Sequence, residues 1–201
     1  MNLDHTRQSF SAIILASGLS ERMGQPKALL MWDKSKTFLE KIIQEYLAAG
    51  CEKIICTVNK QVLPHCKPFG NYPGVKFVLN QHPEWGRTYS VTLGLKEVGN
   101  SQFCFIQNVD NPFIDSGTIK KIFASGDHDT WCSPEFNGVG GHPVLLPEIV
   151  INKILSGIDL EITLQEFLQQ FPKKIFEAED DFILRNINTP EDYRNYLFNK
   201  T

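Results

Sequence analysis

The feature that most constrains this chain is a strand-like run that leads into a charged loop near its N-terminus. Residues 12–16 are strand-forming and apolar, residues 17–20 are mostly small, and a second apolar run follows at residues 28–30. A short apolar run bounded by glycine and proline is typical of a buried strand. Small residues after it allow backbone N–H groups to converge on an anion, and Arg22 and Lys27 add the cations that pair with phosphate. We therefore predict a strand followed by a phosphate-binding loop.

Length and composition favour an ordinary globular protein. At 201 residues the chain can bury one sizeable core but is short for two, so we expect one domain over residues 1–201. With 42% hydrophobic and 21% charged residues, the composition does not indicate disorder. A net charge of −3 and a pI near 6.0 argue against a protein that coats nucleic acid or a membrane surface.

The sequence predicts neither export nor a membrane span. Residues 1–10 are polar and lack the apolar core of a signal peptide, and no apolar run is long enough to cross a bilayer. The five cysteines form no Cys-x-x-Cys pair, and the histidines do not fall at zinc-ligand spacing around them. We interpret these cysteines as reduced, buried side chains and expect a cytoplasmic protein.

Strands and helices alternate over the first two-thirds of the chain. The patterns predict strands at 53–58, 75–79 and 103–107, helices at 38–50 and 88–98, and a loop or short helix within 60–74. This alternation favours an α/β fold with a mostly parallel sheet and helices on both faces. The resulting expectation is a Rossmann-like, doubly wound sheet whose ligand lies at the carboxyl ends of its strands.

The pattern changes after about residue 126. We predict strands at 129–132, 139–146 and 173–177, and helices at 147–155, 162–170 and 190–198. The last helix has the clearest start, because Thr189 is a good N-cap and Pro190 suits the first helical position.

Two common nucleotide-binding loops are excluded by spacing. A Walker A loop requires Gly-Lys followed by Ser or Thr, whereas two residues separate Gly24 from Lys27 here. A dinucleotide-binding loop requires Gly-x-Gly-x-x-Gly, and that spacing does not follow the first strand. The sequence therefore favours neither a P-loop ATPase nor a nicotinamide-dependent dehydrogenase.

Three further segments could carry chemistry. Asp110 follows a buried strand and could hold Mg²⁺ opposite the phosphate loop, or it could only cap the turn before Pro112. The polar loop 80–90 could contact a base or ribose through Arg87 and Ser90, or its tryptophan could cover the core. The segment 138–143 could be a binding loop or a tight turn with a hydrogen-bonded histidine.

Taken together, these residues resemble a known family. The run Leu15-Ala16-Ser17-Gly18-x-Ser20-x-Arg22-Met23-Gly24-x-Pro26-Lys27 looks like the opening signature of the MobA-like nucleotidyltransferases, whose fold is that of the nucleotide-diphospho-sugar transferases. The run Gly141-His142-Pro143-Val144-Leu145 is similar to a motif of the molybdenum cofactor cytidylyltransferase branch. The run Asn186-Ile187-Asn188-Thr189-Pro190-Glu191-Asp192 looks like a motif near the end of both the cytidylyl- and guanylyltransferase branches.

The resemblance implies transfer of a nucleotidyl group from a nucleoside triphosphate to a phosphorylated acceptor such as molybdopterin cofactor, with release of pyrophosphate. It implies Arg22, Lys27 and Asp110 as catalytic residues, and Mg²⁺ as cofactor on Asp110 with Asn186 or Asn188 as a second polar ligand. Gly141, His142 and Pro143 would contact the acceptor. The implied nucleotide-binding residues are Leu15, Ala16, Ser17, Gly18, Ser20, Arg22, Lys27, Asn80, Ser90 and Asp110.

The choice of base and acceptor stays open at this point. In the family, the residue at the position of Ser17 is typically Ala in cytidylyltransferases and Gly in guanylyltransferases, so serine favours CTP over GTP only weakly. A sugar-phosphate or polyol-phosphate nucleotidyltransferase of the same fold is one alternative. Another is a non-catalytic protein that binds a nucleotide or cofactor for a molybdoenzyme, which would then be its protein partner. The presence of Arg22, Lys27 and Asp110 together favours catalysis.

Overall fold

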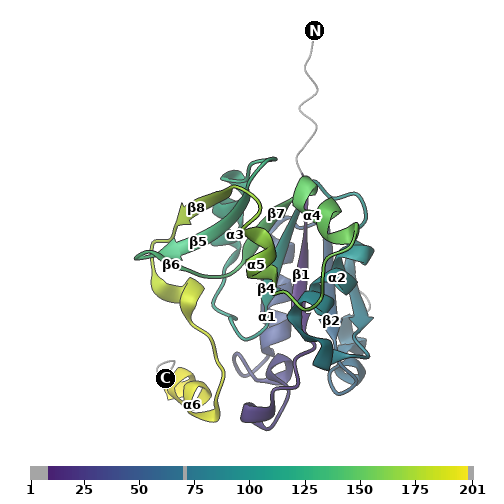
Figure 1. The fold of residues 1–201 in the computed structure, drawn as a ribbon. Helices are drawn as coiled ribbons and strands as arrows, with labels where there is room; N and C mark the ends of the chain where they lie inside the picture. Colours follow the sequence, from purple (N-terminus) through teal and green to yellow (C-terminus); the bar gives the residue numbers. More distant parts are fainter. Residues whose placement is uncertain (1–8, 70–71, 199–201) are drawn as a thin grey trace.

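Four parallel strands form the centre of the protein. The computed structural model describes residues 9–69 and 72–198 (Figure 1). The parallel strands lie in the order β3-β2-β1-β4, and their bounds are β1 Phe10–Ala16, β2 Lys53–Val58, β3 Val75–Leu79 and β4 Phe103–Asn108. The predicted strands are therefore present, with bounds that differ by no more than two residues. Because β1 lies between β2 and β4, its carboxyl end is flanked by strand ends on both sides.

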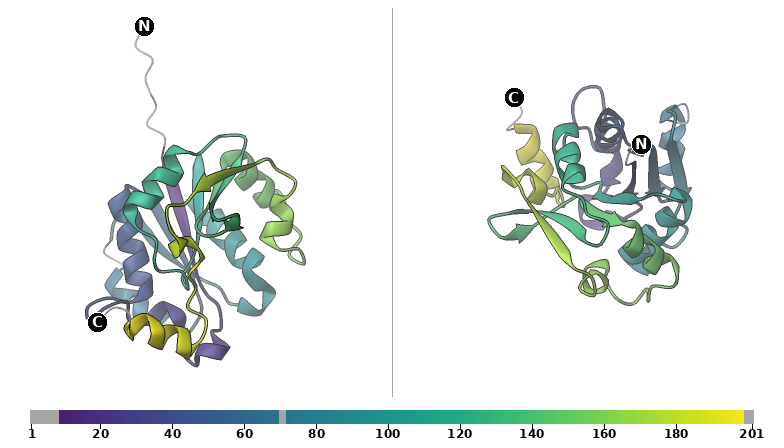
Figure 2. Two further views of the ribbon diagram at one scale, coloured as in Figure 1. Left: turned by 90° about the vertical axis from the view of Figure 1, so that its left-hand side faces the viewer. Right: turned by 90° about the horizontal axis from the view of Figure 1, so that it is seen from above.

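Helices cover both faces of this sheet (Figure 2). On one face, α1 (Phe38–Ala49) and α3 (Ser116–Ala124) pack on alternate strand residues such as Ile14 and Phe105. On the other face, α2 (Gly86–Val98), α4 (Glu148–Leu155) and α5 (Leu164–Leu168) pack on the intervening residues such as Ile13. Strands buried on both faces explain the continuous apolar runs in the sequence. The expected doubly wound α/β fold is confirmed.

The remaining strands extend the sheet beyond β4. Strand β7 (Val144–Pro147) runs antiparallel to β4, and β5 (Trp131–Phe136) follows in antiparallel orientation to β7. Strand β5 also pairs with the short β6 (Val139–Gly140) and, in parallel, with β8 (Lys173–Glu177). One eight-stranded sheet thus runs through the described residues. A single domain over residues 1–201 stays a prediction.

Several predicted elements required correction. The predicted strand 139–146 is two strands, because the chain bends at residues 141–143 around a cis His142–Pro143 peptide bond. In place of the predicted strand 129–132, β5 spans Trp131–Phe136, and in place of the predicted helix 162–170, α5 spans Leu164–Leu168.

Helix α3 was not predicted at all. Its nine residues have too short an apolar repeat to be recognised, although the Asp115 side chain caps it by accepting from the Thr118 amide.

The segment 60–74 contains a 3₁₀ helix at Leu63–Phe69, and residues 70–71 of that segment lie outside the described residues. Residues 1–8 of the predicted polar N-terminal segment lie outside them too. Across the described ranges, no helix combines the length and the apolar character that crossing a bilayer requires.

The C-terminal helix returns to the loop that follows β1 (Figures 1 and 2). Helix α6 (Pro190–Phe198) begins where predicted, and the Thr189 side chain accepts a hydrogen bond from the amide of Asp192. The hydroxyls of Tyr193 and Tyr196 donate to the carbonyls of Met31 and Trp32. These bonds place the chain just before α6 beside the predicted phosphate loop.

Gly94 gives the first testable prediction, because helix α2 approaches β1 closely at this residue. A Cβ atom at Gly94 would lie 2.7 Å from Cγ2 of the fully buried Ile13. Glycine to alanine inside a helix ordinarily stabilises by about 1 kcal/mol, but overpacking a core costs ~1–3 kcal/mol. We expect Gly94→Ala to lower the free energy of unfolding, measured by urea denaturation. A variant as stable as the wild type would show that α2 can move away from the sheet.

Candidate functional site

A cavity of about 690 Å³ opens at the carboxyl ends of β1 and β4. This is the place where a parallel sheet with helices on both faces binds ligands. Most of the predicted nucleotide-binding residues line it, namely Leu15, Ala16, Ser17, Gly18, Ser20, Arg22, Lys27, Ser90 and Asp110. The structure therefore gathers residues from the first loop, from α2 and from the end of β4 around one space of a size typical for small-molecule sites.

The loop after β1 is built from two short 3₁₀ turns, Glu21–Met23 and Lys27–Leu29, which the sequence pattern did not predict. Ser20 adopts a left-handed conformation with φ 55°, and Gly24 adopts one with φ 74°. The buried side chains of Met23 and Ala28 attach the turns to the core. The loop is thus held by apolar contacts, while the exposed Arg22 remains free to reach into the cavity.

Lys27 joins three segments that lie far apart in the sequence. Its Nζ donates to Asp110 Oδ2 at 3.1 Å and to Asn188 Oδ1 at 2.6 Å. The side chains of Lys27 and Asp110 are 13% and 24% exposed, so water screens the pair only in part. A backbone hydrogen bond from the amide of Ile187 to the carbonyl of Asp110 fixes the segment before α6 next to the end of β4.

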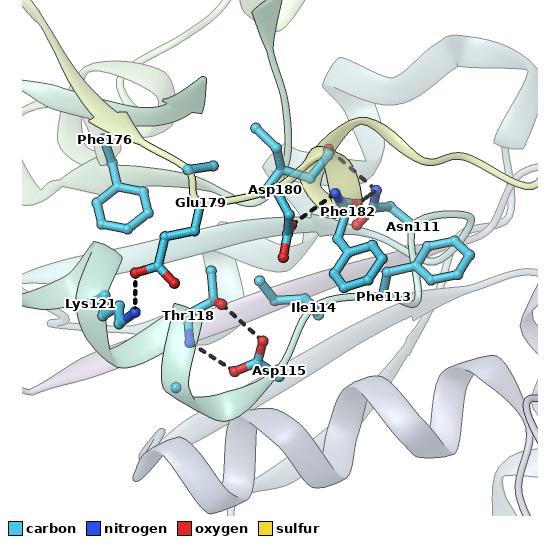
Figure 3. Close-up of a pocket in the computed structure, with 13 residues that line it drawn as sticks. Asn111, Phe113, Ile114, Asp115, Thr118, Lys121, Phe176, Glu179, Asp180 and Phe182 are labelled. Carbon is cyan, nitrogen blue, oxygen red and sulfur yellow. Dashed lines mark hydrogen bonds and ion pairs between the residues drawn. The ribbon is translucent and has the colours of Figure 1, made fainter. Parts of the chain in front are cut away.

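A residue that the sequence reasoning missed holds this C-terminal segment in place. Asn111 is fully buried, and its Nδ2 donates to the carbonyls of Phe182 and Ile183 (Figure 3). The same Nδ2 also donates to the carbonyl of Arg185. Asp192 completes the segment by accepting from the amides of Asn188 and Thr189. Asn111 had one signal in the sequence, since it directly follows Asp110 at the end of a buried strand.

A buried polar group forms one end of the cavity. Ser17 Oγ and Ser90 Oγ lie 2.9 Å apart, and Asn80 Nδ2 donates to Ser90 Oγ at 3.0 Å and to Ser17 Oγ at 3.3 Å. Asn80 itself does not line the cavity, so it supports the two serines from behind. Asn59, which sequence reasoning also missed, donates to the carbonyls of Ser17 and Gly18 from the end of β2.

The segment around His142 lies in a different place. Gly141 and His142 line a second cavity of about 180 Å³, whereas Pro143 is buried beneath it. Burial and the positive charge of Arg87 lower the pKa of His142 to about 3, so its imidazole is neutral near pH 7. Within the part of the chain that the structure describes, the buried His142 Nδ1 has no hydrogen-bond partner. The alternative of a tight turn with a hydrogen-bonded ring is therefore not favoured.

The structure separates the predicted metal ligand Asn186 from the site, and it does not support the alternative in which Trp85 covers the core. The exposed Asn186 carboxamide donates to the carbonyl of Leu184. It lies away from Lys27, Asp110 and Asn188, which we call the Lys27 cluster. Trp85 is 50% exposed and stacks on the ring of His82 at 4.1 Å, so it does not cover the core.

The Lys27 cluster has the donor set for one divalent cation held jointly with a substrate. Asp110 Oδ1 is buried and without a hydrogen bond among the described residues, while its Oδ2 binds Lys27. In the same residues, no group of three or more His, Cys, Asp or Glu side chains could hold a metal by itself. Mg²⁺ is commonly bound by one or two carboxylates together with substrate phosphates, so the free oxygen of Asp110 fits that role.

Comparison with known proteins places the chain in a family. Residues 12–174 match the MobA-like NTP transferase domain. The chain belongs to this family. Molybdenum cofactor cytidylyltransferase of Escherichia coli K12 is 27% identical over 92% of this chain and 94% of that protein. A probable molybdenum cofactor guanylyltransferase of Methanosarcina acetivorans is 24% identical over 92% of this chain and 76% of that protein.

Among solved structures, Rv0371c of Mycobacterium tuberculosis superposes on the MobA-like chain with a TM-score of 0.82 at 20% identity, covering 95% of this chain and 98% of that one. A second structure of Rv0371c is a complex with manganese. At this identity the structural likeness concerns the fold. The family and the nucleotidyltransferase class that the motifs predicted are both confirmed by the match over residues 12–174.

His142 provides a prediction of pH dependence for this MobA-like protein. Between pH 6.5 and about 3, the unfolded histidine binds a proton that the folded one does not, so stability falls as pH falls through this window. We expect this term to amount to about 2 kcal/mol between pH 8 and pH 5. Urea denaturation at both pH values should show a smaller loss for His142→Gln than for the wild type. Equal losses would contradict a neutral, buried His142.

Proposed function

We propose that this chain transfers a nucleoside monophosphate, CMP from CTP, to a phosphorylated small molecule of the molybdopterin type and releases pyrophosphate. The main support is the Lys27 cluster, which joins the loop after β1, the end of β4 and the segment before α6 at one cavity. The likeness to the cytidylyltransferase of Escherichia coli over nearly its full length favours the same class of substrates. The choice of CTP over GTP is the part that most needs a direct test, since guanylyltransferases are relatives too.

The proposed chemistry is an in-line displacement at the α-phosphorus. An oxygen of the acceptor phosphate forms a bond to this phosphorus, the bond to the β-phosphate oxygen breaks, and pyrophosphate leaves with the electron pair. Such a reaction depends on positioning and on stabilisation of negative charge more than on covalent catalysis. Lys27 and the exposed Arg22 are the cations of the loop that would meet the triphosphate.

We assign the free oxygen of Asp110 to Mg²⁺, with Asn188, which shares Lys27 with Asp110, as the second oxygen donor. When bound, the ion would neutralise phosphate charge and help to orient the triphosphate. Asn188 Oδ1 accepts a hydrogen bond from Lys27, so metal binding by this oxygen would require the ammonium group to turn toward the phosphates. The backbone around Ser17 and Gly18, with the Ser17–Ser90 pair, is assigned to base and phosphate contacts.

A transfer assay tests the proposal. The protein, Mg²⁺ and each of the four common nucleoside triphosphates would be incubated with molybdopterin cofactor and with a panel of sugar and polyol phosphates, and pyrophosphate would be measured. We expect release with CTP and the molybdopterin acceptor, and loss of release when EDTA removes the metal. Release with a sugar phosphate would favour the sugar-nucleotide alternative. Tight nucleotide binding without release under any combination would favour a non-catalytic carrier.

Substitution of the Lys27 cluster tests the assignment of the residues. Lys27→Ala and Asp110→Asn should each lower kcat/KM for pyrophosphate release by at least about 100-fold, or ~2.7 kcal/mol. The first removes a cation from the reacting phosphates, and the second removes the carboxylate that would hold Mg²⁺ there. Lys34→Ala removes an equally charged side chain from an exposed position and should leave the rate unchanged. If both cluster variants kept activity within about tenfold of the wild type, these residues would not be catalytic.

A further inference from the structure

Arg87 lies in the wall between the two cavities. It is the second residue of α2 and lines the nucleotide cavity together with Gly86, Ser90 and Asp110. It also lines the second cavity together with His142 and Lys173. Among the described residues, no hydrogen bond or ion pair joins its guanidinium to another side chain. A cation that lines both cavities is therefore available at their boundary, and the family match over residues 12–174 assigns it no role.

The surrounding charges leave the guanidinium as the principal cation of that boundary. Lys27 is engaged by Asp110 and Asn188 on the nucleotide side. On the other side, the ammonium of Lys173 pairs with Glu135 and lies 5.3 Å from the ring centre of Trp131. His142 contributes no charge near pH 7, because burial and the charge of Arg87 itself keep its imidazole neutral. Among the described residues that line the second cavity, Arg87 is thus the cation that no carboxylate binds in an ion pair.

The side chains that line the second cavity suit a small polar ligand. Its wall includes Trp131, whose indole N–H donates to the carbonyl of Leu168, so this ring is held in place. Gln165 and His142 add hydrogen-bonding groups, and His142 Nδ1 is buried and unpaired in the described structure. A volume of about 180 Å³ admits the phosphate end of a ligand and a few atoms attached to it, rather than a whole nucleotide.

We propose that Arg87 binds the phosphate monoester of the acceptor and holds it at the boundary, facing the α-phosphate of the nucleotide. The acceptor would enter through the His142 cavity and the nucleotide through the larger one. A guanidinium suits this position because it can hold two oxygens of one phosphate at once and leave the third free to attack. This inference rests on the proposed function, since it names the group that orients the second substrate of the same reaction.

Binding of the acceptor phosphate by Arg87 differs from a contact with base or ribose, which the sequence suggests for the loop 80–90. A residue that binds the acceptor phosphate should change the affinity for phosphate monoesters and leave the affinity for nucleotide nearly unchanged. A residue of the triphosphate site should do the reverse. Affinity for the two ligands therefore separates the two roles without any need for turnover.

The test uses methyl phosphate as the acceptor probe and the α,β-methylene analogue of CTP with Mg²⁺ as the nucleotide probe. Methyl phosphate would be titrated by calorimetry into the protein saturated with the analogue. We expect Arg87→Gln to weaken the binding of methyl phosphate at least about tenfold. Arg87→Lys should weaken this binding less, because lysine keeps the charge but not the paired donors. Affinity for the analogue should stay within about threefold in both variants. Arg194→Gln, on the exposed face of α6, is the matched control and should change neither affinity.

The outcomes separate failure of this inference from failure of the proposed function. Absence of methyl phosphate binding to the saturated wild type, or equal binding to Arg87→Gln, would overturn the role of Arg87. Equal weakening of both probes in Arg87→Gln would assign the residue to the triphosphate and overturn it too. Absence of binding of the CTP analogue with Mg²⁺ to the wild type, by contrast, would count against the proposed function itself.

Discussion

The contact on which the site depends is the pair of hydrogen bonds from the Lys27 ammonium to Asp110 and Asn188. It connects residues that are 83 and 161 positions apart in the chain. Because the pair is partly shielded from water, its electrostatic attraction is stronger than that of an exposed ion pair. Truncating Lys27 would leave the partly buried carboxylate of Asp110 without its cation. The loop, the strand end and the C-terminal segment therefore form one arrangement.

Buried carboxamides make this arrangement possible. Asn111 donates to the carbonyl of Arg185, and Asn59 donates to the carbonyls of Ser17 and Gly18, in irregular segments beside the site. A buried carbonyl without a donor costs on the order of 1–3 kcal/mol. By donating to such carbonyls, each asparagine avoids this cost in the loop that it holds. Asn59 fixes the start of the loop after β1, and Asn111 fixes the segment that carries Asn188. Rigid loops of this kind allow a site to be ready before its substrate binds.

In the proposed reaction, the two substrates bind in two cavities that lie at different parts of the sheet. The parallel strands β1 and β4 end at the larger cavity, whereas the antiparallel extension with β5, β6 and β8 surrounds the smaller one. Helix α2 begins between them, which is why Arg87 lines both. A two-substrate transfer needs such a boundary, because two phosphate groups that repel each other must be brought together and neutralised at the point of contact.

The sequence by itself determined the parallel half of the fold and, through the spacing in the first loop, the family. Strands buried on both faces leave apolar runs, and the spacing of Gly, Arg and Lys in the first loop is local, so both can be recognised without tertiary contacts. The exposed and half-buried elements after residue 126 carry a weaker pattern, and their bounds were partly wrong. Only the tertiary structure decided that Asn188 and not Asn186 meets Lys27, that Asn59 and Asn111 hold the loops, and that Arg87 lies between two cavities. These facts depend on contacts between distant residues, which no local pattern records.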